Sequence, residues 1–120
     1  MKLVIEEPET EALRHHLSRG FDLTTSRIAV VEVTRAAKVA DPSIETLENV
    51  RDLFADCLLV DVGEVVLSAA ARLASLRVRT LDAIHLASAH VAEPAEVIVY
   101  DRRLRAAASE AGFAVASPGA

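Results

Sequence analysis

Short apolar runs alternate along the chain with longer segments whose apolar residues recur every three or four positions. The short runs lack the polar–apolar alternation of half-exposed strands, which is typical of strands buried on both faces of a parallel sheet. The longer segments have the spacing of helices that bury one side. Strands are expected at 21–25, 57–60, 97–100 and 113–116, and helices at 8–18, 27–40, 44–55, 63–76, 81–92 and 102–111.

Residues that favour helix starts agree with these boundaries. Serine, threonine and aspartate side chains accept hydrogen bonds from the unpaired N–H groups of a first helical turn. They stand just before predicted helices at Ser26, Ser43, Thr80 and Asp101. The alternation of strands and helices predicts one α/β domain over residues 1–120, in which helices cover both faces of a parallel sheet.

Composition and charge narrow the classes of function. The chain has 120 residues, of which 52% are hydrophobic and 3% aromatic, so a single core of small aliphatic side chains is expected. The 13 Lys and Arg stand against 18 Asp and Glu, which gives a formal net charge of −5. This balance argues against a uniformly basic surface that coats nucleic acid, but not against a nuclease that holds a metal ion with acids.

The sequence shows no sign of export or of a membrane anchor. No apolar run reaches the roughly 18 residues of a membrane span. Glu6 and Glu7 interrupt the first apolar stretch too early for a secretory signal, and one Cys cannot form an internal disulfide framework. We therefore expect a cytoplasmic protein that does not associate with a membrane.

Glu32 is an acid within the apolar helical stretch 28–33. Burying a carboxylate among apolar side chains costs free energy unless the group has a partner. One interpretation is an ion pair with Arg35, three residues further along the same helix. The other interpretation is a metal ligand or a general base.

Two further acids stand at predicted helix starts. Asp82 lies in the first turn of the helix after Thr80, where a simple interaction with the helix dipole is the alternative to a functional role. His85, three residues further on, could join Asp82 at a metal ion, but a hydrogen-bonded place in the core is the favoured interpretation. Asp101 directly follows the strand 97–100, and ligands of parallel sheets bind outside the carboxyl ends of the strands. Its alternative role is a helix cap.

Together, Glu32, Asp82 and Asp101 predict a site for a hard divalent cation, because Mg²⁺ prefers carboxylate oxygens and retains several waters. Such an ion activates water and stabilises phosphoryl-transfer transition states. Arginines, which pair bidentately with phosphate, occur nearby in the sequence. They are Arg72, Arg77, Arg79, Arg102, Arg103 and Arg105. For each arginine taken singly, a solvated place on a helix surface is the favoured interpretation.

Four stretches of the chain resemble PIN-domain ribonucleases of the VapC toxin type. They occur in the family's order and cover nearly the whole chain. The stretches TLDAIHLA at 80–87 and YDRRL at 100–104, which continues to Phe113, are the more specific. Those at 6–13 and 26–36 are weaker. The resemblance implies a single PIN-like α/β domain.

The resemblance also implies an activity and its partners. It implies a Mg²⁺-dependent endoribonuclease, with Mn²⁺ as a possible replacement, that acts as the toxin of a type II toxin–antitoxin pair. The implied partners are an RNA substrate, a VapB-like antitoxin and a second copy of the chain in a homodimer. Glu32, Asp82 and Asp101 match the family's second, third and fourth acids, which hold the metal and orient the attacking water.

Polar and basic residues complete the implied site. Ser26 and Thr80 match polar positions beside the family's acids. The candidates for contact with RNA are Arg79, Arg102 and Arg103. With 3% aromatic residues, base stacking is not expected to dominate RNA recognition.

One part of the family pattern is absent from the printed sequence. PIN-domain toxins open with a central strand that ends in an Asp-Thr/Ser-Ser-Ala-type motif, whose Asp is the first metal ligand, whereas residues 1–5 resemble the segment just after it. We therefore expect a chain shortened at its start, through a start codon assigned too late or through a genuine loss. Three carboxylates predict weaker binding of divalent ions and little RNA cleavage. The alternative function is a catalytically impaired module that binds the antitoxin or itself, with helices 8–18 and 43–55 as candidate surfaces.

A third interpretation sets the resemblance aside. A receiver-like phosphoryl-transfer domain could use the same acids, but it would need an early acid pair and a lysine at a late strand end. Lysine occurs only at Lys2 and Lys38. A Gly-rich phosphate loop and a Gly-x-Ser-x-Gly elbow are also absent, which argues against P-loop and serine-hydrolase functions.

Overall fold

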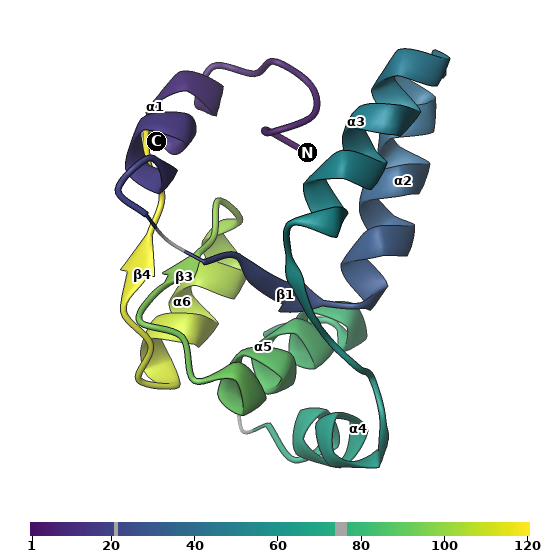
Figure 1. Ribbon diagram of the computed structural model, residues 1–120. Coiled ribbons are helices and arrows are strands. Elements are labelled where there is room, and N and C mark those ends of the chain that lie inside the picture. The colour runs from purple at the N-terminus through teal and green to yellow at the C-terminus, as the bar shows by residue number, and fades with distance from the viewer. Residues whose placement is uncertain (21, 74–76) are drawn as a thin grey trace. The chain divides into compact units, whose positions relative to one another are not determined.

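The computed structural model describes residues 1–20, 22–73 and 77–120, which form two compact units (Figure 1). One unit comprises Met1–Leu59 with Pro118–Ala120, and the other comprises Val60–Ser117. Helices and strands follow one another in the order α1 (Thr10–Leu17), β1 (Thr24–Ser26), α2 (Ile28–Ala40), α3 (Ile44–Ala55), β2 (Leu58–Val60), α4 (Glu64–Ala71), α5 (Thr80–Ala92), β3 (Val97–Ile98), α6 (Arg102–Glu110) and β4 (Val115–Ala116). The predicted α/β class is confirmed.

The unit that contains the N-terminus is built around the packing of α2 against α3. Ala37 of α2 has no exposed surface and Val50 of α3 is buried. Because alanine has a short side chain, it permits a close approach of the two helices. Strand β1 lies beside β2, and the N–H of Leu58 donates to the carbonyl of Leu23 at 2.9 Å.

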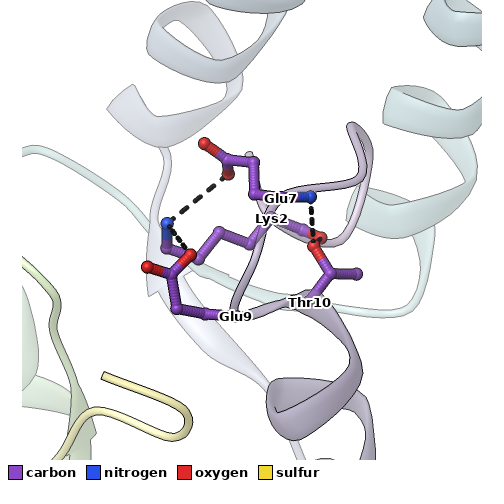
Figure 2. Close-up of polar contacts among 4 residues, drawn as sticks. All are labelled: Lys2, Glu7, Glu9 and Thr10. Carbon is purple, nitrogen blue, oxygen red and sulfur yellow. Dashed lines mark hydrogen bonds and ion pairs between the residues drawn. The ribbon is translucent and has the colours of Figure 1, made fainter.

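The start of α1 is held by a polar network around Thr10 (Figure 2). The fully buried Thr10 hydroxyl donates to the Lys2 carbonyl at 2.7 Å and accepts from the Glu7 N–H at 2.9 Å. The Lys2 Nζ lies 3.1 Å from an oxygen of Glu9 and 3.5 Å from one of Glu7. The hydrogen bond with Lys2 is the main cause that lowers the pKa of Glu9. These bonds fold the first residues back onto the helix.

The second unit joins a helix pair to a short parallel sheet. Helix α4 packs against α5, and β3 runs parallel to β4 (Figure 1). In this pairing Ile98 lies opposite Ala116. Its core contains Leu86 of α5 with Ala107 and Ala108 of α6, all nearly fully buried. Because these alanines are small, the half-buried side chains packed around them complete the core. They are Leu73, Val78, Leu104, Phe113 and Val115.

Most predicted helices are confirmed, whereas the strands are shorter than predicted. Helix α3 has the predicted bounds, and the Ser43 hydroxyl caps it by accepting from the Thr46 N–H at 3.2 Å. Strand β4 begins two residues later than expected, because the Phe113 N–H donates back to the Ala108 carbonyl at 3.1 Å and closes the turn after α6. Phe21 and residues 74–76, which fall in a predicted strand and helix, lie outside the described residues.

None of the helices in the described part of the chain is long and apolar enough to span a membrane.

Candidate metal-binding site

Asp101 stands where the strand β3 gives way to helix α6. Its backbone is extended, with φ −71° and ψ 129°, and its Oδ1 accepts a hydrogen bond from the N–H of Leu104 at 2.9 Å. The predicted helix cap is therefore confirmed. Its Oδ2 makes no hydrogen bond within the described residues, and the side chain is exposed. Asp101 thus caps a helix with one oxygen and offers the other to solvent.

Asp82 plays a related part at the start of α5. The sequence predicts Thr80 as the cap, but Thr80 is the first helical residue and the cap position belongs to Arg79. The physical reason is that the Oδ2 of Asp82 reaches back and accepts the N–H of Arg79 at 3.3 Å. The helix start is thus stabilised from inside the first turn. The Oδ1 of this half-buried carboxylate makes no hydrogen bond with the described residues.

Ser26 and Glu32 lie in the other unit. The sequence predicts Ser26 as the cap of the following helix, but Ser26 is the last residue of β1, and Arg27 occupies the cap position of α2. The reason is that the Arg27 backbone is already helical, so the buried Ser26 hydroxyl accepts from the Ile28 N–H, at a long 3.4 Å, and not from the N–H groups further along the first turn that the structure describes. Glu32 is half-buried one turn further along α2.

The structure therefore places the predicted site residues on two units. Asp82 and Asp101 belong to the unit Val60–Ser117, and Glu32 to the unit with the N-terminus. Within residues 1–20, 22–73 and 77–120, no group of three His, Cys, Asp or Glu side chains is arranged to hold a metal ion. The convergence of all three acids on one ion stays a prediction.

The donor chemistry of Asp82 and Asp101 fits a magnesium ion. Each keeps one carboxylate oxygen in a helix-start hydrogen bond and has a second oxygen outside it. Mg²⁺ is typically bound by one or two carboxylates together with several waters. The two acids can therefore act as single-oxygen ligands without breaking the helix starts that orient them.

The candidate RNA-binding arginines are exposed. Arg79, Arg102 and Arg103 form no ion pair with the acids that the structure describes. The first turn of α6 contains no acidic residue, although a helix N-terminus favours negative charge. Placing cations there costs free energy, roughly 0.3–1 kcal/mol per charge. The guanidinium groups are thus available to an external anion.

Sequence reasoning did not single out Ser117. Its hydroxyl donates to the carbonyl of Val99, two residues before Asp101. The signal in the sequence is the Ser-Pro step directly after the last apolar run, because proline ends strand pairing.

Comparison with known proteins identifies the family of this chain. The model of the PIN domain matches residues 1–110. The chain belongs to the PIN-domain family. This confirms the resemblance drawn from TLDAIHLA at 80–87 and YDRRL at 100–104.

Relatives within the PIN-domain family match almost end to end. Ribonuclease VapC47 of Mycobacterium tuberculosis is 37% identical over 126 residues, covering 99% of this chain and 91% of its own length. Ribonuclease VapC46 of the same organism is 37% identical over 120 residues, with 98% and 91% covered. Ribonuclease VapC35 is 35% identical over 125 residues, with 99% and 91% covered. The chain is therefore a PIN domain of the VapC type.

Proposed function

We propose that this protein is a Mg²⁺-dependent endoribonuclease, with Mn²⁺ as a functional replacement, and the toxin of a type II toxin–antitoxin pair. Relatives that share 35–37% of its residues are named ribonucleases of the VapC type. The single observation that supports the proposal most is the Asp101 carboxylate, which follows a parallel strand and has one oxygen outside the helix cap.

Three carboxylates would hold the ion. Asp101 and Asp82 would each offer the oxygen that lies outside its helix-start hydrogen bond, and Glu32 would be the third acid. A bound ion would supply Lewis-acid chemistry, activating water and offsetting negative charge on the scissile phosphate. The hydrogen bond from the Leu104 N–H keeps the Asp101 carboxylate from rotating. Glu32 and Asp82 help to orient the attacking water, and Ser26 and Thr80 are the supporting polar residues.

Arginines of the second unit would bind the RNA backbone. Arg102 and Arg103 directly follow Asp101 in the first turn of α6, and Arg79 occupies the cap position of the helix that carries Asp82. A guanidinium binds phosphate oxygens through two parallel hydrogen bonds. These contacts would place a phosphodiester beside the two carboxylates without reading its bases.

We further propose a VapB-like antitoxin as partner, a homodimer as the assembly and the cytoplasm as the location. Helix α3 carries the exposed Ile44, which is 76% accessible, and an apolar side chain so exposed is suited to a protein interface. Helix α1 is the other candidate surface.

The test is RNA cleavage by the purified chain with Mg²⁺, with Mn²⁺ and with EDTA. Because three carboxylates predict weak metal binding, we expect slow cleavage that requires a divalent ion and is lost in Asp101→Asn. Asp52→Asn is the matched control, because Asp52 is an exposed aspartate on α3 that lies outside the predicted site. Cleavage that persists in EDTA, or in Asp101→Asn, would contradict the proposal. Mn²⁺ binding without any cleavage would assign the chain to the catalytically impaired alternative.

A further inference from the structure

The parallel pairing of β3 with β4 continues to the residues just before Asp101. In a parallel ladder, every second residue of one strand makes two backbone hydrogen bonds with the other strand. Its N–H donates to the carbonyl of the residue before its partner, and its carbonyl accepts from the N–H of the residue after its partner. Ile98 lies opposite Ala116. The N–H of Val97 donates to the Ala114 carbonyl at 2.8 Å, and the N–H of Val99 donates to the Ala116 carbonyl at 3.0 Å. Both bonds follow the parallel pattern.

The next bond of this ladder has no backbone donor. Continuing this register by one residue places Ser117 opposite Val99, so the carbonyl of Val99 should accept from the N–H of Pro118. Proline has no N–H. The Ser117 hydroxyl donates to the Val99 carbonyl instead. Because Val99 is only 6% exposed, losing this donor would leave a nearly buried carbonyl unsatisfied.

Proline also favours the backbone geometry in which the Ser117 hydroxyl can replace the missing backbone donor. A residue before proline is driven toward extended backbone conformations. This preference favours a Ser117 backbone that continues the direction of β4, and the Ser117 hydroxyl reaches the Val99 carbonyl at the strand end. The Ser-Pro step removes a backbone donor and supplies a side-chain donor at the same rung.

The consequence falls on Asp101, two residues beyond Val99. On one side, the N–H and carbonyl of Val99 are both bonded to the Ala116–Ser117 segment. On the other side, the Asp101 carboxylate accepts the N–H of Leu104. Hydrogen bonds thus hold the chain at Val99, before Asp101, and at Leu104, after it.

We propose that Ser117 is a positioning residue for Asp101: its hydroxyl replaces the hydrogen bond that Pro118 cannot make, and so holds the strand end that presents the Asp101 carboxylate. That this carboxylate binds a divalent cation rests on the proposed function. Removing partners that orient metal ligands typically lowers metal affinity or activity 10–100-fold.

The first test needs no metal. Ser117→Ala removes the hydroxyl and Ser117→Thr retains one. Ser88→Ala is the matched control, because the Ser88 hydroxyl also donates to a backbone carbonyl, that of Ile84, at 2.8 Å within α5. We expect Ser117→Ala to accelerate hydrogen exchange of the Leu104 amide about tenfold relative to the core amide of Leu86.

Ser117→Thr and Ser88→Ala should leave that ratio close to the wild-type value. An unchanged Leu104 ratio in Ser117→Ala overturns the proposal. An equal acceleration in Ser117→Thr also overturns it, because the hydroxyl would then not be the cause.

The second test measures Mn²⁺ affinity by titration of the same variants, with Asp101→Asn alongside. We expect Ser117→Ala to bind Mn²⁺ roughly tenfold more weakly and Ser117→Thr to bind it like the wild type. If Asp101→Asn abolishes Mn²⁺ binding while Ser117→Ala binds normally, the positioning role is wrong. If Asp101→Asn binds Mn²⁺ like the wild type, the proposed metal site is wrong, and the Leu104 exchange ratio alone still decides the role of Ser117.

Discussion

Two exposed aspartates stand just before helices, Asp41 before α3 and Asp101 before α6, and they use their carboxylate oxygens differently. Asp41 commits both oxygens: Oδ1 accepts the Ser43 N–H at 3.1 Å, and Oδ2 accepts the Thr46 hydroxyl at 2.7 Å. Asp101 commits Oδ1 to the Leu104 N–H, and its Oδ2 makes no hydrogen bond with the described residues.

The difference comes from which residue caps the helix. In α3 the cap is Ser43, and Asp41 supports it from outside the helix. In α6 the aspartate itself is the cap, so a single backbone N–H uses a single oxygen. Position and exposure alone would make Asp41 and Asp101 equally good candidates for a metal ligand. The number of uncommitted oxygens separates a structural carboxylate from one that can still bind a ligand.

The largest expected effect comes from replacing each aspartate by asparagine. Asparagine caps helices about as well as aspartate, so Asp101→Asn should melt at nearly the wild-type temperature. Its RNA cleavage should fall roughly a hundredfold or more, because a charged metal ligand is lost. Asp41→Asn should show the reverse, with a lower melting temperature and cleavage close to wild type. Thermal melts and cleavage rates of both variants measure this; equal loss of activity in both would remove the distinction.

A smaller effect concerns the pH dependence of stability. Hydrogen bonds from the Thr46 hydroxyl and from Ser43 lower the pKa of Asp41. The folded-state pKa is therefore below the unfolded value of about 3.9. The resulting stabilisation is complete above the unfolded value and is lost as the pH falls through the folded value. The difference in melting temperature between wild type and Asp41→Asn should be constant near neutral pH and shrink below about pH 4.

This prediction is checked by melting both proteins across the acidic range. The exposure of Asp41 keeps the expected difference small, because solvent screens the charge. A difference that grows as the pH falls would show that the carboxylate is not stabilised in its charged form.

The smallest expected effect tests whether Arg102, in the first turn of α6, serves RNA binding and not the stability of the fold. Arg102→Gln removes a cation from a helix N-terminus, which should stabilise the fold by about 0.3–1 kcal/mol. The same change should weaken RNA binding and reduce its dependence on salt, because one phosphate contact is lost. Denaturant unfolding and binding titrations at two salt concentrations measure the two quantities. Lower stability in Arg102→Gln would indicate that the arginine is a structural residue.

Local chemistry explains what could be predicted from the sequence. Helix α3 and its Ser43 cap were correct, and so was Asp101 as the cap of α6, because a capping side chain reaches backbone groups only a few residues away. At Ser26 and Thr80 the same rule failed by one residue. There, the helical backbone of Arg27 and the returning side chain of Asp82 shifted the start.

The amino-acid sequence by itself determined the order of helices and strands, the family, and the residue types that point to a divalent cation. Those properties depend on spacing along the chain and on side-chain chemistry. Tertiary structure decided where the pairing of β3 with β4 stops, since the Ser117 hydroxyl takes the place of the missing Pro118 N–H at the carbonyl of Val99, 18 residues earlier in the sequence. It also decided which aspartate keeps an oxygen for a ligand, because that depends on which donors folding brings within hydrogen-bond distance.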